Sequence, residues 1–169
     1  GKGMRILREK GISVAEGVLK EKCDGINEVF FHYIRTKTPY VTMKYAMTLD
    51  GKIATRAGHS KWITGNPARV RVHEDRNRHM SIMTGVGTVL TDDPMLNCRL
   101  PGGRQPVRLI LDTHLRTPLT AQVITTAGEI PTWLLTCCED TEKQERYREK
   151  GCQVLKMAEK DGHVDLCQA

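Results

Sequence analysis

The chain has 169 residues, of which 39% are hydrophobic and 27% are charged. This composition is typical of a soluble globular protein and excludes collagen-like, coiled-coil and disordered classes. No apolar stretch approaches the roughly 20 residues that a membrane-spanning helix needs, so no membrane contact is expected. The net charge of +6 favours anionic partners, either polynucleotides or phosphorylated small molecules. The six cysteines form no C-x-x-C pair, and we expect reduced thiols in a cytoplasmic protein without a metal site.

The amino-terminal part is expected to contain two helices and a short strand. Residues 4–10 predict a short helix, and residues 12–14 alternate like a strand. Apolar residues recur at helical spacing over residues 19–34, which predicts one amphipathic helix. The polar residues 36–39 then form the best candidate for a domain boundary.

After this linker, residues 40–49 alternate between apolar and polar side chains, which predicts a strand that ends in an Asp-Gly turn. Residues 53–62 are expected to form an irregular loop. A helix should begin at Asn66-Pro67, with a capping residue and a proline in the first turn, and run to about His79. Further strands are expected at 80–84, 107–111, 123–125, 132–136 and 154–155, with helices beginning near residue 85 and covering 141–150. This alternation indicates an α/β fold.

Two loops are candidate sites. Residues 44–54 run from a strand into a loop, where open α/β sheets bind ligands, although a core strand with an ordinary turn explains the pattern better in isolation. Residues 58–65 place Trp62 among hydroxyl side chains. Such a tryptophan offers a flat wall for a planar heterocycle, or it anchors the loop as a buried indole, and the two readings are about equal.

Three further segments could bind an anion. The helix that begins at residue 66 carries four arginines, which suit phosphate, yet Glu74 and Asp75 among them favour a solvated face. Residues 85–88 open a helix with two glycines, a weak phosphate motif because it lacks the third glycine of the dinucleotide fingerprint. In residues 92–99, Arg99 could meet a phosphate and the acids could bind sugar hydroxyls, although a plain turn explains the Asp-Asp-Pro equally well. No H-x-E with a partner P-C-x-x-C occurs, so zinc deaminase chemistry is not expected within this chain.

The order of these motifs is more specific than any one of them. The sequence reads P-Y-V-T-M-K at 39–44, L-D-G-K-I-A at 49–54, S-K-W-I-T-G at 60–65 and G-V-G-T-V-L at 85–90, followed by D-D-P and Arg99. Together these blocks closely resemble the reductase domain of the RibD family of bifunctional riboflavin-biosynthesis deaminase/reductases. Nearly the whole chain is covered by the resemblance.

This resemblance implies two domains. Residues 1–36 resemble the end of the family's amino-terminal deaminase domain, a cytidine-deaminase-like α/β domain. Residues 37–169 resemble the first part of the reductase domain, which implies an incomplete dihydrofolate-reductase-like α/β fold of three layers, a sheet with helices on both faces. The family's reductase domain continues beyond this chain into a Glu-Gly-Gly-type segment that holds the cofactor pyrophosphate. We therefore expect the chain to be a piece of a larger enzyme that alone binds NADPH weakly and turns over little.

The implied reaction is an NADPH-dependent reduction of 5-amino-6-(5-phosphoribosylamino)uracil, whose ribose becomes a ribityl chain. Deamination of the pyrimidine precursor, with its zinc, would belong to the part outside this chain. The implied partners are a phosphorylated pyrimidine substrate and further copies of the same chain, in the cytoplasm. The rival readings are a small basic nucleic-acid-binding module, or a stand-alone reductase, against which the deaminase-like residues before Pro39 argue.

The resemblance also implies roles for individual residues. The expected cofactor contacts are Ala46, Trp62, Thr88, Asp92 and Thr113. The expected substrate contacts are Ser60, Arg76, Leu96 and Arg99. The catalytic candidates, which would handle a proton near the site of hydride transfer, are Lys44 and Asp50. The residue types alone already point to Arg76, Arg99 and Thr88, whereas Ala46, Leu96 and Thr113 rest on the resemblance.

Overall fold

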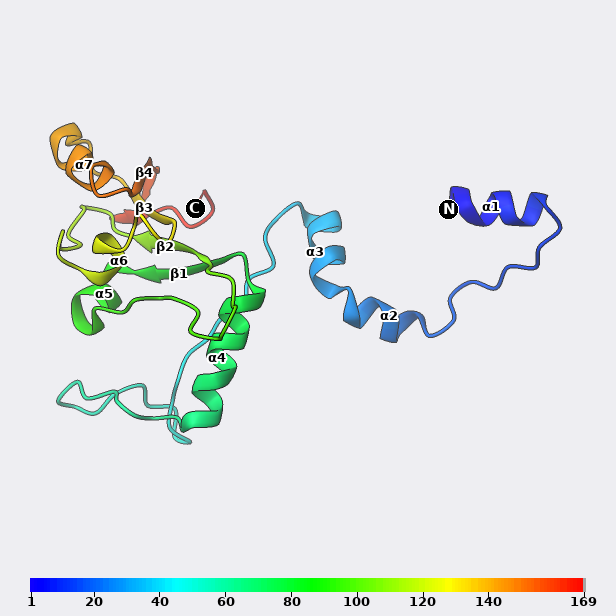
Figure 1. The fold of residues 1–169 in the computed structure, drawn as a ribbon, viewed down its shortest axis with the longest axis horizontal. Helices are drawn as coiled ribbons and strands as arrows, with labels where there is room; N and C mark the ends of the chain where they lie inside the picture. Colours follow the sequence, from blue (N-terminus) through cyan, green and yellow to red (C-terminus); the bar gives the residue numbers. More distant parts are fainter. Residues whose placement is uncertain (169) are drawn as a thin grey trace. The chain divides into compact units, whose positions relative to one another are not determined.

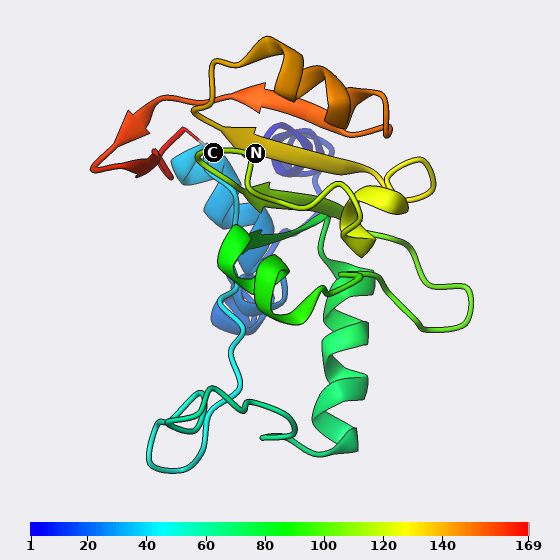
Figure 2. The ribbon, with the colours of Figure 1, turned by 90° about the vertical axis from the view of Figure 1, so that its left-hand side faces the viewer.

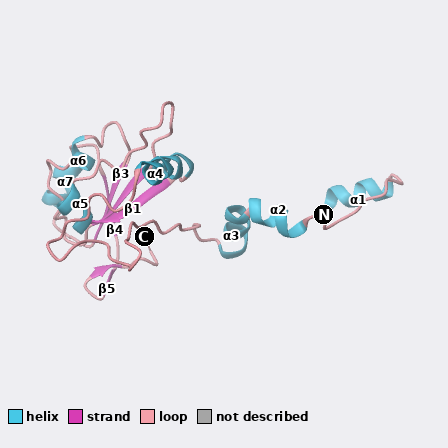
Figure 3. Ribbon diagram, turned by 90° about the horizontal axis from the view of Figure 1, so that it is seen from below, coloured by secondary structure: helices cyan, strands magenta, loops and turns pink. Residues whose placement is uncertain are grey.

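The computed structural model describes residues 1–168 and divides the chain into two compact units, Gly1–Ala46 and the residues from Met47 on. The first unit contains three short helices, which Figures 1 and 3 show joined by loops: α1 (Lys2–Glu9), α2 (Lys20–Ile26) and α3 (Glu28–Thr36). None of these helices contains a buried residue. The helix expected over residues 4–10 is confirmed.

The single helix expected over residues 19–34 is wrong, because the helix is interrupted at Asn27. This residue has φ −115° and ψ 19°, and its side-chain Nδ2 donates a hydrogen bond to the Cys23 carbonyl at 2.9 Å. An asparagine side chain that bonds to the backbone in this way competes with the helix and ends it.

The strands expected over residues 12–14 and 40–49 are also absent from the described residues. The alternation over 40–49 is real, but its apolar side chains are exposed, with Val41 at 83% and Met43 at 82%. A strand forms through hydrogen bonds to a neighbouring strand and through one buried face. Neither is present at this segment, so the pattern alone does not produce the strand.

The second unit is built on a parallel sheet. Four strands lie side by side in the order β1-β2-β3-β4, as Figure 2 shows. Residues Gly85, Leu111 and Leu135 are in register across the first three strands. The strands are β1 (Ser81–Gly85), β2 (Val107–Leu111), β3 (Thr132–Thr136) and β4 (Gln153–Lys156). The helices are α4 (Asn66–Arg78), α5 (Val86–Asp92), α6 (Gln122–Thr125) and α7 (Thr141–Arg148). The α/β class is confirmed, and β2 and β3 have the bounds that the sequence predicts.

One face of the sheet carries the hydrophobic core. Successive side chains of a strand point to opposite faces, so Ile110 and Leu134, both fully buried, share a face with Ile82 and Val154. The core helices are α5, α6 and α7, which cover this face with Val89, Val123, Ile124 and Tyr147. On the opposite face Met83 and Leu155 are about 40% exposed, and α4 contributes no buried residue. The helices that build the described core therefore form one layer.

The strand expected over residues 123–125 is wrong, because these residues form α6. The Asp93 carboxylate accepts a hydrogen bond from the Gln122 backbone N–H at 2.8 Å, which satisfies one free donor at the helix start. The Ala121 carbonyl accepts from the backbone N–H groups of Ile124 and Thr125. Val123 and Ile124 are buried by this short turn, so packing overrides their β propensity.

Two smaller features also differ from the sequence-based expectation. The N-cap of α4 is Gly65 and no side chain caps it, because the Asn66 side chain accepts a hydrogen bond from Arg69 instead. A short antiparallel pair, β5 (Glu159–Lys160) and β6 (His163–Val164), is present and was not expected.

A fully buried arginine connects the layers of the second unit. The Arg108 side chain on β2 donates to the Thr132 hydroxyl at 2.8 Å, the Thr126 hydroxyl at 2.8 Å, the Met95 carbonyl at 3.1 Å and the Ile130 carbonyl at 2.9 Å. Burial lowers the pKa of this guanidinium to about 10, so it stays charged at neutral pH. No carboxylate pairs with it in the described part of the chain. Its charge is therefore held by neutral oxygens alone.

We predict that Arg108→Met lowers the free energy of unfolding by about 2–4 kcal/mol, because two carbonyls and two hydroxyls lose their donor in the interior. The matched control is Arg116→Met, whose exposed side chain makes no hydrogen bond among the described residues and which should change stability by less than about 0.5 kcal/mol. Urea unfolding of both variants measures the difference. Equal midpoints for the two variants would contradict a structural role for Arg108.

Candidate functional site

Two predicted cofactor residues lie at the carboxyl edge of the sheet. Strands β1 and β2 end in register, so α5 and Thr113 follow them at the same edge. Thr88 is exposed in the first turn of α5. A side chain at Gly85 or Gly87 would meet no atom within 4 Å, so the backbone of this turn is open. Parallel sheets bind their ligands at this edge.

The tryptophan loop lies beside the end of α5. Lys61 Nζ is 3.9 Å from Asp92 Oδ1, which places the loop next to another predicted cofactor residue. The Trp62 indole is 74% exposed, and the Arg69 guanidinium carbon lies 4.4 Å from its ring centroid. The alternative of a buried anchoring indole is therefore wrong, and the ring offers a flat exposed surface that a cation polarises. Ser60, a predicted substrate contact, is half-buried in the same loop.

Helix α4 and residues 97–99 bring two predicted substrate residues together. Arg76 Nη1 donates to the Asn97 carbonyl at 2.9 Å, and Arg76 Nε is buried without a partner in the described residues. Burial, and then the nearby charge of Arg99, lower the pKa of Arg76. Two guanidinium groups therefore share one small region, where they repel each other unless an anion lies between them.

The acidic residues of α4 do not neutralise this pair. Glu74 and Asp75 both bind Arg71, at 3.1 and 3.4 Å. Within residues 1–168, Arg76 and Arg99 have no carboxylate at ion-pair distance. The solvated-face alternative thus describes Arg71, whereas Arg76 is half-buried and has no carboxylate at ion-pair distance in the described part of the chain.

The remaining predicted residues are placed less favourably. Leu96 is 7% exposed and packs in the core with φ 50°, so its side chain is not open to a ligand. Asp50 lies in a tight turn, where its carboxylate accepts a hydrogen bond from the Thr48 hydroxyl. Lys44 and Ala46 belong to the first compact unit.

Sequence reasoning missed His73, whose ring lies against Arg99. His73 Nε2 is 3.1 Å from Arg99 Nε, and His73 Nδ1 is 3.2 Å from the Arg99 backbone nitrogen. Burial, and then the charges of Arg76 and Arg99, lower the pKa of His73. Its position three residues before Arg76, on the same helix face, was the one signal available in the sequence.

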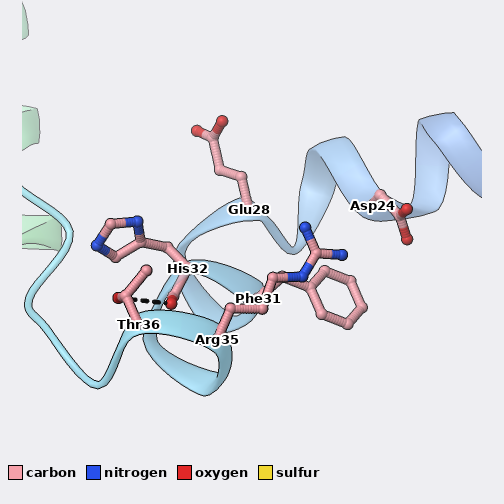
Figure 4. Close-up of a pocket in the computed structure, with 6 residues that line it drawn as sticks. All are labelled: Asp24, Glu28, Phe31, His32, Arg35 and Thr36. Carbon is pink, nitrogen blue, oxygen red and sulfur yellow. Dashed lines mark hydrogen bonds between the residues drawn. The ribbon is translucent and has the colours of Figure 1, made fainter.

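A separate hollow lies on α2 and α3 (Figure 4). The Arg35 guanidinium carbon lies 5.6 Å from the centroid of the Phe31 ring, and the Thr36 hydroxyl donates to the His32 carbonyl. The Asp24 carboxylate in this hollow already pairs with Lys20. In the described part of the chain no three His, Cys, Asp or Glu side chains gather as metal ligands would. None of the described helices is long and apolar enough to cross a bilayer.

Comparison with known proteins gives consistent relatives. The RibD C-terminal domain family matches residues 39–169. The riboflavin biosynthesis protein RibD of Actinobacillus pleuropneumoniae is 53% identical over 98% of this chain and 44% of its own length, and that of Bacillus amyloliquefaciens is 45% identical over 97% and 44%. The deaminase/5-amino-6-(5-phosphoribosylamino)uracil reductase of Thermotoga maritima, solved at 1.80 Å, superposes with a TM-score of 0.74 at 36% identity, covering 93% of this chain and 50% of that one.

The chain thus spans less than half the length of these curated relatives. A structure of Acinetobacter baumannii RibD agrees as well, with a TM-score of 0.74 and 32% identity over 94% of this chain. The family match covers the whole second unit, which contains the sheet, the tryptophan loop and the arginine pair. The chain therefore belongs to the RibD C-terminal domain family.

Proposed function

We propose that this chain provides the reductase part of a riboflavin-biosynthesis enzyme, which reduces the ribose of 5-amino-6-(5-phosphoribosylamino)uracil to a ribityl chain with NADPH. The observation that carries this proposal is the pair Arg76 and Arg99, which has no acidic partner in the described residues. Arg76 lies near the end of α4, which leads into the amino-terminal end of β1, and Arg99 lies between α5 and β2. The name of the Thermotoga maritima relative, a 5-amino-6-(5-phosphoribosylamino)uracil reductase, supports the same substrate.

Residues of α5 and of the loop that contains Trp62 fit part of a nicotinamide dinucleotide. The exposed Trp62 ring can stack on a planar ring, and the open backbone at Gly85 and Gly87 admits a phosphate group. When bound, NADPH supplies a hydride to C1 of the sugar in its ring-opened imine form. We assign the cofactor contacts to Ala46, Trp62, Thr88, Asp92 and Thr113.

For the substrate, we assign the phosphate to Arg76 and Arg99, with further contacts from Ser60 and Leu96. Guanidinium groups bind phosphate oxygens in pairs and so fix the substrate's position. Reduction of the imine adds the hydride to carbon and one proton to nitrogen. We assign the handling of that proton to Lys44 and Asp50. The protein then acts mainly by alignment and charge neutralisation, without a covalent intermediate.

We also propose a division of the chain by domain. Residues 1–36 form the end of a deaminase domain whose zinc site lies outside this sequence, and residues 37–169 form the first part of the reductase. The start of the family match at residue 39 supports this division. In this proposal the enzyme acts in the cytoplasm as a homo-oligomer. The nucleic-acid-binding alternative has no support from the relatives.

The direct test is NADPH oxidation by the full-length protein in the presence of the phosphoribosylaminouracil substrate, followed by the loss of nicotinamide absorbance. We expect saturable turnover that requires both ligands, and little turnover by residues 1–169 alone. Duplex DNA should neither bind nor compete at moderate salt. A full-length protein that oxidises no NADPH with this substrate would overturn the proposed function.

Removing the arginine pair should weaken substrate binding selectively. We expect Arg99→Ala and Arg76→Ala each to raise the KM for the phosphorylated substrate at least about tenfold, because a charge-assisted contact to phosphate is lost. The control is Arg71→Ala, whose guanidinium binds Glu74 and Asp75 and should leave this KM unchanged. The KM for NADPH serves as an internal reference. Equal effects of Arg71 and Arg99 variants would place the phosphate elsewhere.

The assignment of Asp50 to proton handling gives a separate prediction. Asp50→Asn keeps the side-chain oxygen that accepts from the Thr48 hydroxyl, so the turn should remain intact. We expect kcat at saturating ligands to fall about 10²-fold or more, in the range of general acid–base catalysis, while both KM values change little. Steady-state kinetics measures the split. An unchanged kcat would remove Asp50 from the mechanism.

A further inference from the structure

His73 makes an unusual set of contacts for a helix residue beside a cationic site. It lies in the middle of α4, and its ring contacts Arg99, which is 26 residues later in the sequence. Each ring nitrogen lies close to a donor of the same arginine: Nε2 lies 3.1 Å from the side-chain Nε, and Nδ1 lies 3.2 Å from the backbone nitrogen. A neutral imidazole has one acceptor nitrogen, so it accepts from one of these donors at a time.

The surroundings favour the neutral form of this imidazole. The pKa of His73 is lowered by burial and then by the positive charges of Arg76 and Arg99, while a hydrogen bond to the Asn97 backbone acts in the opposite direction. The neighbouring acids Glu74 and Asp75 are engaged with Arg71. A neutral ring can accept a hydrogen bond from a guanidinium, whereas an imidazolium could only repel it.

The contact also selects which part of Arg99 stays available. A guanidinium carries five N–H donors, one on Nε and four on the two terminal nitrogens. When Nε donates to the ring, the inner end of the guanidinium is fixed. The N–H groups of the two terminal nitrogens then remain available to another acceptor. No hydrogen bond or ion pair within residues 1–168 uses those terminal donors. They form the fork that binds a phosphate in a bidentate manner.

Helix α4 holds the same segment at two further points. Arg76 Nη1 donates to the Asn97 carbonyl at 2.9 Å, and the Cys98 thiol donates to the His73 carbonyl at 3.4 Å. The backbone around Arg99 is therefore fixed by contacts that do not involve the Arg99 side chain. His73 adds the last constraint, because it contacts both the backbone and the side chain of Arg99.

We propose that His73 is a positioning residue, which accepts a hydrogen bond from Arg99 and thereby holds the Arg99 fork toward the substrate phosphate. The inference rests on the proposed function for the identity of the substrate, but not for the coupling between His73 and Arg99. The ring itself does not touch the substrate in this arrangement.

The first test compares His73→Leu with His73→Gln in the full-length protein. Leucine removes the acceptor, whereas the glutamine side-chain oxygen can restore it. We expect His73→Leu to raise the KM for the phosphorylated substrate about 5- to 20-fold, with kcat and the KM for NADPH within about twofold, and His73→Gln to recover most of the loss. His163→Leu, an exposed histidine on β6, is the matched control. A KM unchanged in His73→Leu, or a loss not recovered by His73→Gln, would overturn the proposal.

The second test is a double-variant cycle with inorganic phosphate as the probe, measured by calorimetric titration. If His73 acts through Arg99, His73→Leu should weaken phosphate binding in the wild-type background and have no further effect in Arg99→Ala. Additive losses in the double variant would show an independent effect of His73 and overturn the proposal.

The two tests separate this inference from the proposed function. A protein that binds phosphate through the coupled pair but reduces no substrate would overturn the function and leave the positioning role standing. An active reductase in which His73→Leu and Arg99→Ala have additive effects would support the proposed function and overturn the positioning role. A wild-type protein that binds neither phosphate nor the substrate would overturn both.

Discussion

The buried Arg108 guanidinium is the contact on which the second unit most depends. Its four hydrogen bonds reach β3 through Thr132, the residue after α6 through Thr126, the turn before β3 through Ile130, and the segment after α5 through Met95. A charge held inside by neutral oxygens tolerates little displacement, because each lost partner leaves an unsatisfied buried group. The sheet, α6 and the segment that leads to Arg99 are therefore fixed by one side chain. The position of the segment that carries Arg99 therefore depends on the hydrogen bond between Arg108 and the Met95 carbonyl.

The parts of the fold that the sequence predicts are those that local patterns determine. The bounds of β2 and β3 follow from short apolar runs between turn residues, and these runs are buried in the parallel sheet. Failures occur where a distant partner decides the outcome. Residues 123–125 look like a strand, but they form a helix whose first residue, Gln122, donates its backbone N–H to the Asp93 carboxylate, 29 residues earlier in the chain. The alternation over 40–49 has no partner strand in the described residues, so it remains irregular.

The same distinction applies to the candidate site. Arg76 and Arg99 could be singled out from the sequence because an arginine in a basic segment is itself a signal for an anion. The contact of His73 with Arg99 could not be predicted, because the two residues are 26 positions apart and their spacing alone does not indicate that they meet. For Leu96 the resemblance implies a substrate contact, which stays a prediction, while its side chain packs in the core. Residue type identifies the charges of the site, but packing decides which atoms face a ligand.

The hydrogen bonds of residues 98–105 limit how this region can vary among related sequences. Gln105 binds both the backbone N–H and the carbonyl of Cys98, each at 2.8 Å, and so closes the loop at its base. Arg104 donates to the carbonyls of Arg78 and His79, which places a positive charge at the carboxyl end of α4. A side chain at Gly103 would lie 2.7 Å from the Cys98 sulfur. An insertion between these fixed ends would have to bulge outward at the exposed Pro101-Gly102 tip. A change in loop length would therefore displace Arg99, and Gly102, with φ 67°, could be replaced only at a cost in backbone strain.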